Sequence, residues 1–227
     1  MYIHSLELKN YRNYEDLSID FDSGTTIFYG DNAQGKTNIL EAVYISATTK
    51  SHRGSKDREI IRFHQEESHI RTQVMKSEVL HRIDMHLRKN KTKGIAIDGV
   101  PIKRSGELFG VANVIFFSPE DLSIIKNGPS ERRRFLDLEL CQLDKLYLYH
   151  YTNYNKVLNQ RNNLLKQIYF KPQLADTIDI WNEQLVQYGV ELIKVRRNFI
   201  NQLNDILKEI HARLTGNKEQ LCIQLIL

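Results

Sequence analysis

Eight consecutive residues near the N-terminus combine two glycines, a lysine and a hydroxyl side chain at a fixed spacing. They match the pattern G-x-x-x-x-G-K-[ST] at every fixed position. The eight residues are Gly30, Asp31, Asn32, Ala33, Gln34, Gly35, Lys36 and Thr37. The glycines permit backbone torsions that a Cβ would block, so the loop amides can point at phosphate oxygens. The pattern therefore predicts a phosphate-binding loop.

The last two residues of the loop indicate which phosphate compound it would take. Lys36 places a compact positive charge where β- and γ-phosphates would lie. The hydroxyl of Thr37 is a suitable ligand for Mg²⁺. We therefore expect a nucleoside triphosphate site in which Thr37 is the metal ligand.

Such a loop needs a strand before it and a helix after it. Residues Thr25 to Tyr29 are rich in β-forming types and end at Gly30, and Ile39 to Ala47 carry apolar residues at helical spacing. The predicted order is thus strand, glycine loop, helix.

Alternating apolar and polar residues predict further strands in the first half of the chain. The alternation involves Leu6 and Leu8; Leu17, Ile19 and Phe21; Ile70, Thr72 and Val74; and Ile83, Met85 and Leu87. Ile95 to Val100 contain Asp-Gly, which favours a tight hairpin turn. The apolar run Val114 to Phe117 is predicted to be a buried strand.

From about residue 132 the pattern becomes helical. Apolar residues recur every three or four positions from Leu136 to Leu158 and from Ile178 to Ile210, and Pro172 lies between these runs. The pattern predicts two long helices packed as an antiparallel hairpin. We expect a P-loop core lobe with an antiparallel β-subdomain at 1–135, a helical arm at 136–215, and the start of a return to the core lobe at 216–227. Within the last segment, residues 221–227 look like the beginning of a strand.

The overall composition fits a soluble globular protein. The 227 residues are 41% hydrophobic and 26% charged, with a formal net charge of +4. The two cysteines, Cys141 and Cys222, form no metal-binding pattern. The N-terminus does not have the pattern of a signal peptide, and no apolar run is long enough to span a membrane. We expect a cytoplasmic protein.

Four segments, in the same order, resemble the RecF family among the SMC-like and ABC-type ATPase heads. They are residues 8–14 (LKNYRNY), 32–42 (NAQGKTNILEA), 50–53 (KSHR), and 118–122 (SPEDL) continuing to 128–137 (GPSERRRFLD). The resemblance implies a mixed α/β head of the ABC type with a helical-hairpin arm.

The resemblance also implies a function in DNA repair, DNA replication and the SOS response. Such heads hold ATP and Mg²⁺ between two copies, dimerise on the nucleotide, and bind duplex and single-strand DNA at gaps. They act with the RecR clamp protein to help RecA load. By the same resemblance Arg12 and Asn13 would line the nucleoside side of the pocket, and Arg53 would reach toward nucleotide or DNA.

Two motifs that ABC-type heads use for hydrolysis do not occur in the 227 residues. These are the LSxGQ-like signature and an apolar Walker B strand that ends in Asp and a second acid. The run from Val114 to Asp121 is not a Walker B strand, because Ser-Pro separates its apolar residues from its carboxylates. We therefore expect a truncated chain with no catalytic residue of its own and negligible ATPase activity alone.

Several basic residues are candidates for sequence-independent contacts with DNA phosphates. They are Lys56, Arg58, Lys89, Lys91, Lys93, Arg132 and Arg133. Two other hypotheses remain open from the residues. One is a P-loop kinase or GTPase-like switch, for which an NKxD motif would be expected but does not occur. The other is a partner-binding module with a vestigial nucleotide loop.

Overall fold

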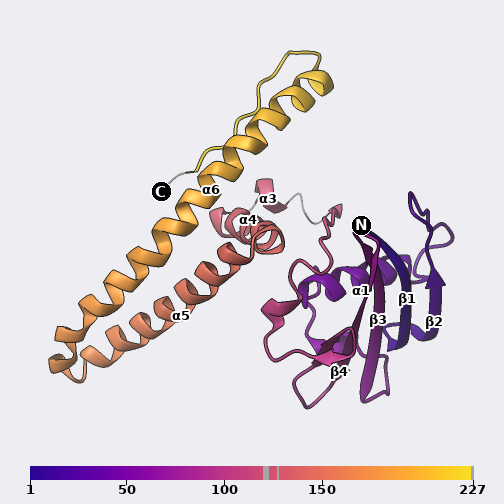
Figure 1. Ribbon diagram of the computed structural model, residues 1–227, viewed down its shortest axis with the longest axis horizontal. Helices are drawn as coiled ribbons and strands as arrows, with labels where there is room; N and C mark the ends of the chain where they lie inside the picture. Colours follow the sequence, from indigo (N-terminus) through magenta and orange to yellow (C-terminus); the bar gives the residue numbers. More distant parts are fainter. Residues whose placement is uncertain (120–122, 127, 226–227) are drawn as a thin grey trace. The chain divides into compact units, whose positions relative to one another are not determined.

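The computed structural model describes residues 1–119, 123–126 and 128–225 (Figure 1). The chain forms two compact units, Met1–Lys126 and Asn127–Leu227. The helix α4 (Pro129–Leu143) packs against the helix that follows it and belongs to the second unit. The domain boundary at residue 135 stays a prediction.

The first unit is built on one antiparallel sheet in the order β2-β1-β3-β4-β5-β6. Its strands are β1 (Tyr2–Tyr11), β2 (Tyr14–Asp20), β3 (Glu67–Lys76), β4 (Val79–Arg88), β5 (Gly94–Ile97) and β6 (Val100–Pro101). The strands predicted from alternating residues are confirmed, except that Phe21 lies just beyond β2. The antiparallel β-subdomain of the predicted fold is therefore present.

The two faces of this sheet differ because successive side chains of a strand point to opposite sides. One face carries Leu6, Ile70 and Ile83, which are fully or almost fully buried. Helix α1 (Lys36–Thr48) packs on the sheet at β3 and β4 (Figure 1). Its Ser46 hydroxyl lies 2.7 Å from that of Thr72. The other face carries charged and imidazole side chains that are open to solvent.

The Asp-Gly turn lies where the sequence predicts it. Asp98 has φ 52° and Gly99 has φ 82°, and the turn joins β5 to β6 with Ile97 opposite Val100. Positive φ at both central residues matches the twist of the flanking strands. Two short helices lie between the strands and after them. Helix α2 (Asp57–Ile60) precedes β3, and the 3₁₀ helix η1 (Ser105–Leu108) follows β6.

Two predicted strands are wrong. Residues 25–29 and 114–117 have no strand structure. Ile27 and Tyr29 are 76% and 92% exposed, and Phe117 is 80% exposed. A strand requires a hydrogen-bonded neighbouring strand. Neither segment is part of the sheet that the described residues form, so both lack such a neighbour.

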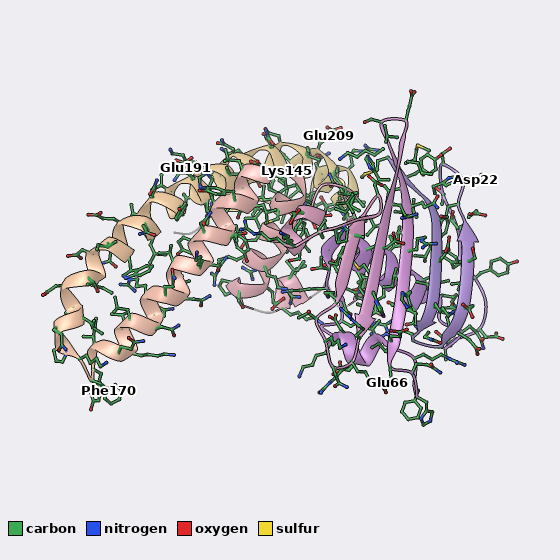
Figure 2. The ribbon with its side chains drawn as sticks, turned by 60° about the horizontal axis from the view of Figure 1, so that its bottom comes forward. Asp22, Glu66, Lys145, Phe170, Glu191 and Glu209 are labelled. Atoms are coloured by element: carbon green, nitrogen blue, oxygen red, sulfur yellow. The ribbon has the colours of Figure 1, made fainter. Side chains whose placement is uncertain are left out.

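The second unit is helical, as predicted, and contains α4, α5 (Lys145–Ile168), the 3₁₀ helix η3 (Pro172–Thr177) and α6 (Ile178–Thr215). Helices α5 and α6 form an antiparallel hairpin, with Phe170 at its turn (Figure 2). Pro172 begins η3, so the predicted break is confirmed. The separation of α4 from α5 at Asp144, whose carboxylate accepts a hydrogen bond from the Leu146 amide, was not predicted.

Helix α3 (Ser123–Lys126) ends the first unit. The segment predicted to begin a strand, 221–227, is irregular over 221–225. Ile226 and Leu227 lie outside the described residues, as do Glu120, Asp121 and Leu122 of the 118–122 segment. No helix among the described residues combines the length and the apolar character needed to cross a membrane.

Candidate nucleotide-binding site

The phosphate loop curves between the end of residues 25–29 and the start of α1. Gly30 has φ 139° and Gly35 has φ 97°, which are torsions that L side chains rarely adopt. The Gly35 carbonyl accepts hydrogen bonds from the amides of Asn38 and Ile39, at 2.7 and 3.3 Å. Helix α1 thus begins at Lys36, within the last two residues of the loop, and its first turn contains no acidic residue.

Lys36 folds back over the loop. Its Nζ donates hydrogen bonds to the carbonyl oxygens of Gly30 and Asp31, at 2.8 and 2.6 Å. These bonds hold an ammonium group inside the ring of loop backbone. A phosphate placed there would meet this charge together with the positive end of the α1 dipole.

The turn between β1 and β2 packs against the loop. The Asn13 amide nitrogen donates to the Gln34 carbonyl at 3.2 Å, and the Tyr14 hydroxyl donates to the same oxygen at 3.3 Å. A Cβ on Gly35 would lie 2.6 Å from the Asn13 side chain and 2.7 Å from the Tyr14 hydroxyl. Glycine is therefore required at 35 both by its φ and by this close approach.

Arg12 lies beside the loop but its guanidinium faces α1. It forms hydrogen bonds of 2.9 and 2.6 Å with the two carboxylate oxygens of Glu41, and further bonds to the Ser55 hydroxyl and the Glu59 carbonyl. Glu41 is fully buried. Burial alone would raise the pKa of Glu41, but hydrogen bonds from Arg12 and Ser51 and the nearby guanidinium charges hold it below its ordinary value.

Arg53 approaches the first turn of α1. Its Nη1 donates to the Asn38 side-chain oxygen at 3.3 Å, and Asn38 in turn donates to the Asn13 side-chain oxygen at 2.8 Å. The structure thus brings Asn13 and Arg53, two of the three residues suggested by resemblance, to the same side of the loop. Thr37 lies in the first turn of α1 with an exposed side chain, so a metal ion from solvent can reach its hydroxyl.

Sequence reasoning missed the residues that support the loop from behind. They are Tyr14, Asn38, Glu41 and Ser51. Glu41 carried a signal that could have been used, because it stands in a helical segment among residues that are buried, Ile39, Ala42 and Ile45. A charged residue at such a position needs a partner of opposite charge.

The basic residues proposed to contact DNA have different surroundings. In the first unit, Lys89 forms an ion pair with Glu66 at 2.9 Å, and Lys93 forms one with Asp57 at 2.9 Å. Lys56, Arg58 and Lys91 are exposed. In the second unit, Arg132 and Arg133 lie exposed near the start of α4.

Comparisons with known proteins agree on one family. The family model described as "AAA ATPase domain" matches residues 1–225. DNA replication and repair protein RecF of Lachnoclostridium phytofermentans is 64% identical over 97% of this chain and 61% of its own length. RecF of Agathobacter rectalis is 60% identical over 99% of this chain and 62% of its own length.

Solved structures give the same result. The recombination mediator protein RecF-ATP in the RecFOR pathway superposes with a TM-score of 0.90 at 35% identity, over 95% of this chain and 58% of that one. An SMC ATPase, at 20% identity and a TM-score of 0.50, shares the fold over 61% of this chain and 99% of its own. The chain spans about 60% of the length of the curated relatives it matches.

Proposed function

The chain belongs to the AAA ATPase domain family and, within it, to the RecF proteins, and from this we propose that it binds ATP with Mg²⁺ at residues 30–37. The observation that carries the proposal is Lys36, whose ammonium is held on the carbonyls of Gly30 and Asp31 at the N-terminus of α1. A solved relative is described as RecF-ATP, which supports ATP as the nucleotide.

Each residue of the site has a separate task in this proposal. The loop amides and Lys36 bind the phosphates, and the Thr37 hydroxyl holds Mg²⁺, which neutralises phosphate charge. Asn13 keeps the loop in shape through Gln34, because its amide reaches that carbonyl. Arg53, held next to Asn38, supplies a positive charge on the open side of the loop.

We further propose that the whole protein is a DNA repair and replication ATPase. Its ATP-dependent homodimer would bind duplex and single-strand DNA at gaps and act with a RecR-type clamp protein to help RecA load. Two observations support this: the relatives are named for DNA replication and repair, and one is called a recombination mediator in the RecFOR pathway.

Nucleotide titration with and without Mg²⁺ tests the site. The chain should bind a fluorescent ATP analogue, and Lys36→Ala should weaken binding about 10- to 100-fold, the loss expected for a charge-assisted hydrogen bond. Thr37→Ala should reduce the gain in nucleotide affinity that Mg²⁺ produces. Lys50→Ala, which removes an exposed lysine just beyond α1, should leave binding unchanged. No binding by the unaltered chain would favour a vestigial loop.

DNA binding separates the proposed repair function from a small-molecule kinase or switch. Binding to gapped duplex should be measured at several salt concentrations with and without ATP. We expect affinity that falls with salt and rises with ATP. Nucleotide binding without any effect on DNA would support the kinase or switch instead.

A further inference from the structure

Three side chains converge at one place on the solvent face of the sheet, the face opposite to helix α1. Glu67 and His69 are two residues apart on β3 and therefore point to the same side. His86 on β4 lies directly opposite His69 in the antiparallel register. Strand β3 begins next to Glu66, which Figure 2 shows at one end of the sheet.

The two imidazole rings and the carboxylate already share contacts. His86 Nε2 lies 2.8 Å from Glu67 Oε2, and His69 Nε2 lies 3.7 Å from Glu67 Oε1. The rings stack, with centroids 4.2 Å apart and planes inclined by 18°. One potential ligand atom from each residue lies within 4.8 Å of the other two. The Nε2 atoms of His69 and His86 thus both face the carboxylate of Glu67.

The three groups are near the spacing that a tetrahedral ion requires. Ligand atoms about 2.0–2.2 Å from a zinc ion are roughly 3.3 Å from one another. Here one ligand atom from each residue lies within 4.8 Å of the other two, and the contacts of 2.8 and 3.7 Å are to different oxygens of Glu67. The side chains are 36–54% exposed, so small rotations can bring them together and an ion can enter from solvent.

The ligand types select the class of ion. Imidazole nitrogen suits zinc, copper and nickel, whereas magnesium and calcium take oxygen ligands. Lys9 on β1 pairs with His69, and its positive charge disfavours a bound cation. The negative charge of the Glu67 carboxylate offsets the charge of Lys9. We propose that Glu67, His69 and His86 form a binding site for a divalent transition-metal ion such as zinc, which cross-links β3 to β4 and keeps a fourth position for water.

The chain also offers a matched comparison. His81, on the same strand as His86, lies 2.9 Å from the carboxylate of Asp98, which is the same kind of histidine–carboxylate contact. Among the described residues only the Glu67 cluster brings three such groups within reach of one ion. His81 therefore controls for a histidine–acid contact without the third ligand.

Zinc titration of the full chain, freed of metal with a chelator and without nucleotide, tests the proposal. We expect one equivalent to bind, and His69→Gln, His86→Gln or Glu67→Gln to weaken binding by at least about tenfold. His81→Gln and Cys222→Ser should bind zinc as the unaltered chain does. Cobalt should give the absorption bands of a tetrahedral site, and His69→Gln should remove them. Far-UV circular dichroism would verify that each variant is folded.

Three results would overturn the proposal: no stoichiometric zinc binding, undiminished binding by the His69→Gln/His86→Gln double variant, or equal loss in His81→Gln or Cys222→Ser. The proposal does not depend on the nucleotide site. Lys36→Ala should weaken ATP binding and keep zinc binding, so the two proposals fail separately.

Discussion

A line of polar contacts behind the phosphate loop connects residues far apart in the sequence. Arg12 pairs with Glu41, Glu41 accepts a hydrogen bond from Ser51, and the Ser51 hydroxyl accepts one from the Arg53 amide. The Arg53 guanidinium then reaches Asn38 in the first turn of α1. Arg12 therefore acts on the loop by positioning α1 and Arg53 through Glu41.

Replacing Glu41 should destabilise the first unit. Glu41→Gln leaves the largely buried Arg12 guanidinium without its carboxylate, and breaking a buried ion pair costs about 3 kcal/mol. The folded-state pKa of Glu41 lies below its ordinary value of 4.5, so the stabilisation is complete above pH 4.5 and is lost as pH falls below it. The melting temperatures of the two proteins should differ most at pH 6–7 and converge as pH falls through the folded-state pKa of Glu41.

A second carboxylate serves as the control for this prediction. Glu15 is 70% exposed and pairs with Arg62 at 3.2 Å. Glu15→Gln should change stability by less than about 1 kcal/mol, because exposed ion pairs contribute little. If Glu41→Gln behaves like Glu15→Gln, the buried pair does not support the fold.

The elements themselves show how far sequence alone could go. The sheet around α1 was predictable because each strand alternates residues such as Leu6, Ile70 and Ile83 toward one buried face. The loop was predictable because its pattern is local. Residues 25–29 were not, since β-forming types do not reveal whether a neighbouring strand exists. The break at Asp144 was hidden because apolar spacing continues through it, although Asp is a favoured N-cap.

A buried polar cluster joins the three long helices of the second unit. Asp137 on α4 accepts hydrogen bonds from the Tyr147 hydroxyl on α5 and from Arg196 on α6, at 2.5 and 2.6 Å. Asp137 is 7% exposed and the Arg196 side chain 16%. The helical periodicity could place these residues on their helices but could not show that they meet.

Removing the carboxylate from this cluster should loosen the helical unit. Asp137→Ala leaves Arg196 buried without a counter-charge, and we expect a loss of about 3 kcal/mol, seen as earlier melting of helical circular dichroism. The double variant Asp137→Met/Arg196→Met should recover most of that loss. Lys194→Ala, at an exposed pair with Glu191, should have almost no effect. A double variant less stable than Asp137→Ala would contradict this account.

At the scale of the molecule, charge is distributed over both units and only some of it is available to a polyanion. The net charge is +4, too small to indicate DNA binding without regard to position. Lys91 is exposed, whereas the nearby Lys89 holds the carboxylate of Glu66. A lysine already paired with an acid contributes less to phosphate binding, because that ion pair must be broken before the ammonium can bind a phosphate.

This difference gives a prediction for the proposed DNA-binding function. Lys91→Ala should weaken binding to duplex DNA similarly for all sequences and reduce the slope of log affinity against log salt by about one. Lys89→Ala should have the smaller effect, because the Lys89 ammonium already forms an ion pair with Glu66 and contributes less to phosphate binding. Binding measured by fluorescence anisotropy from 50 to about 200 mM salt would give both slopes. Equal slopes for the unaltered chain and Lys91→Ala would place the DNA elsewhere on the protein, and the exposed Arg133 in the second unit would then be the next residue to change.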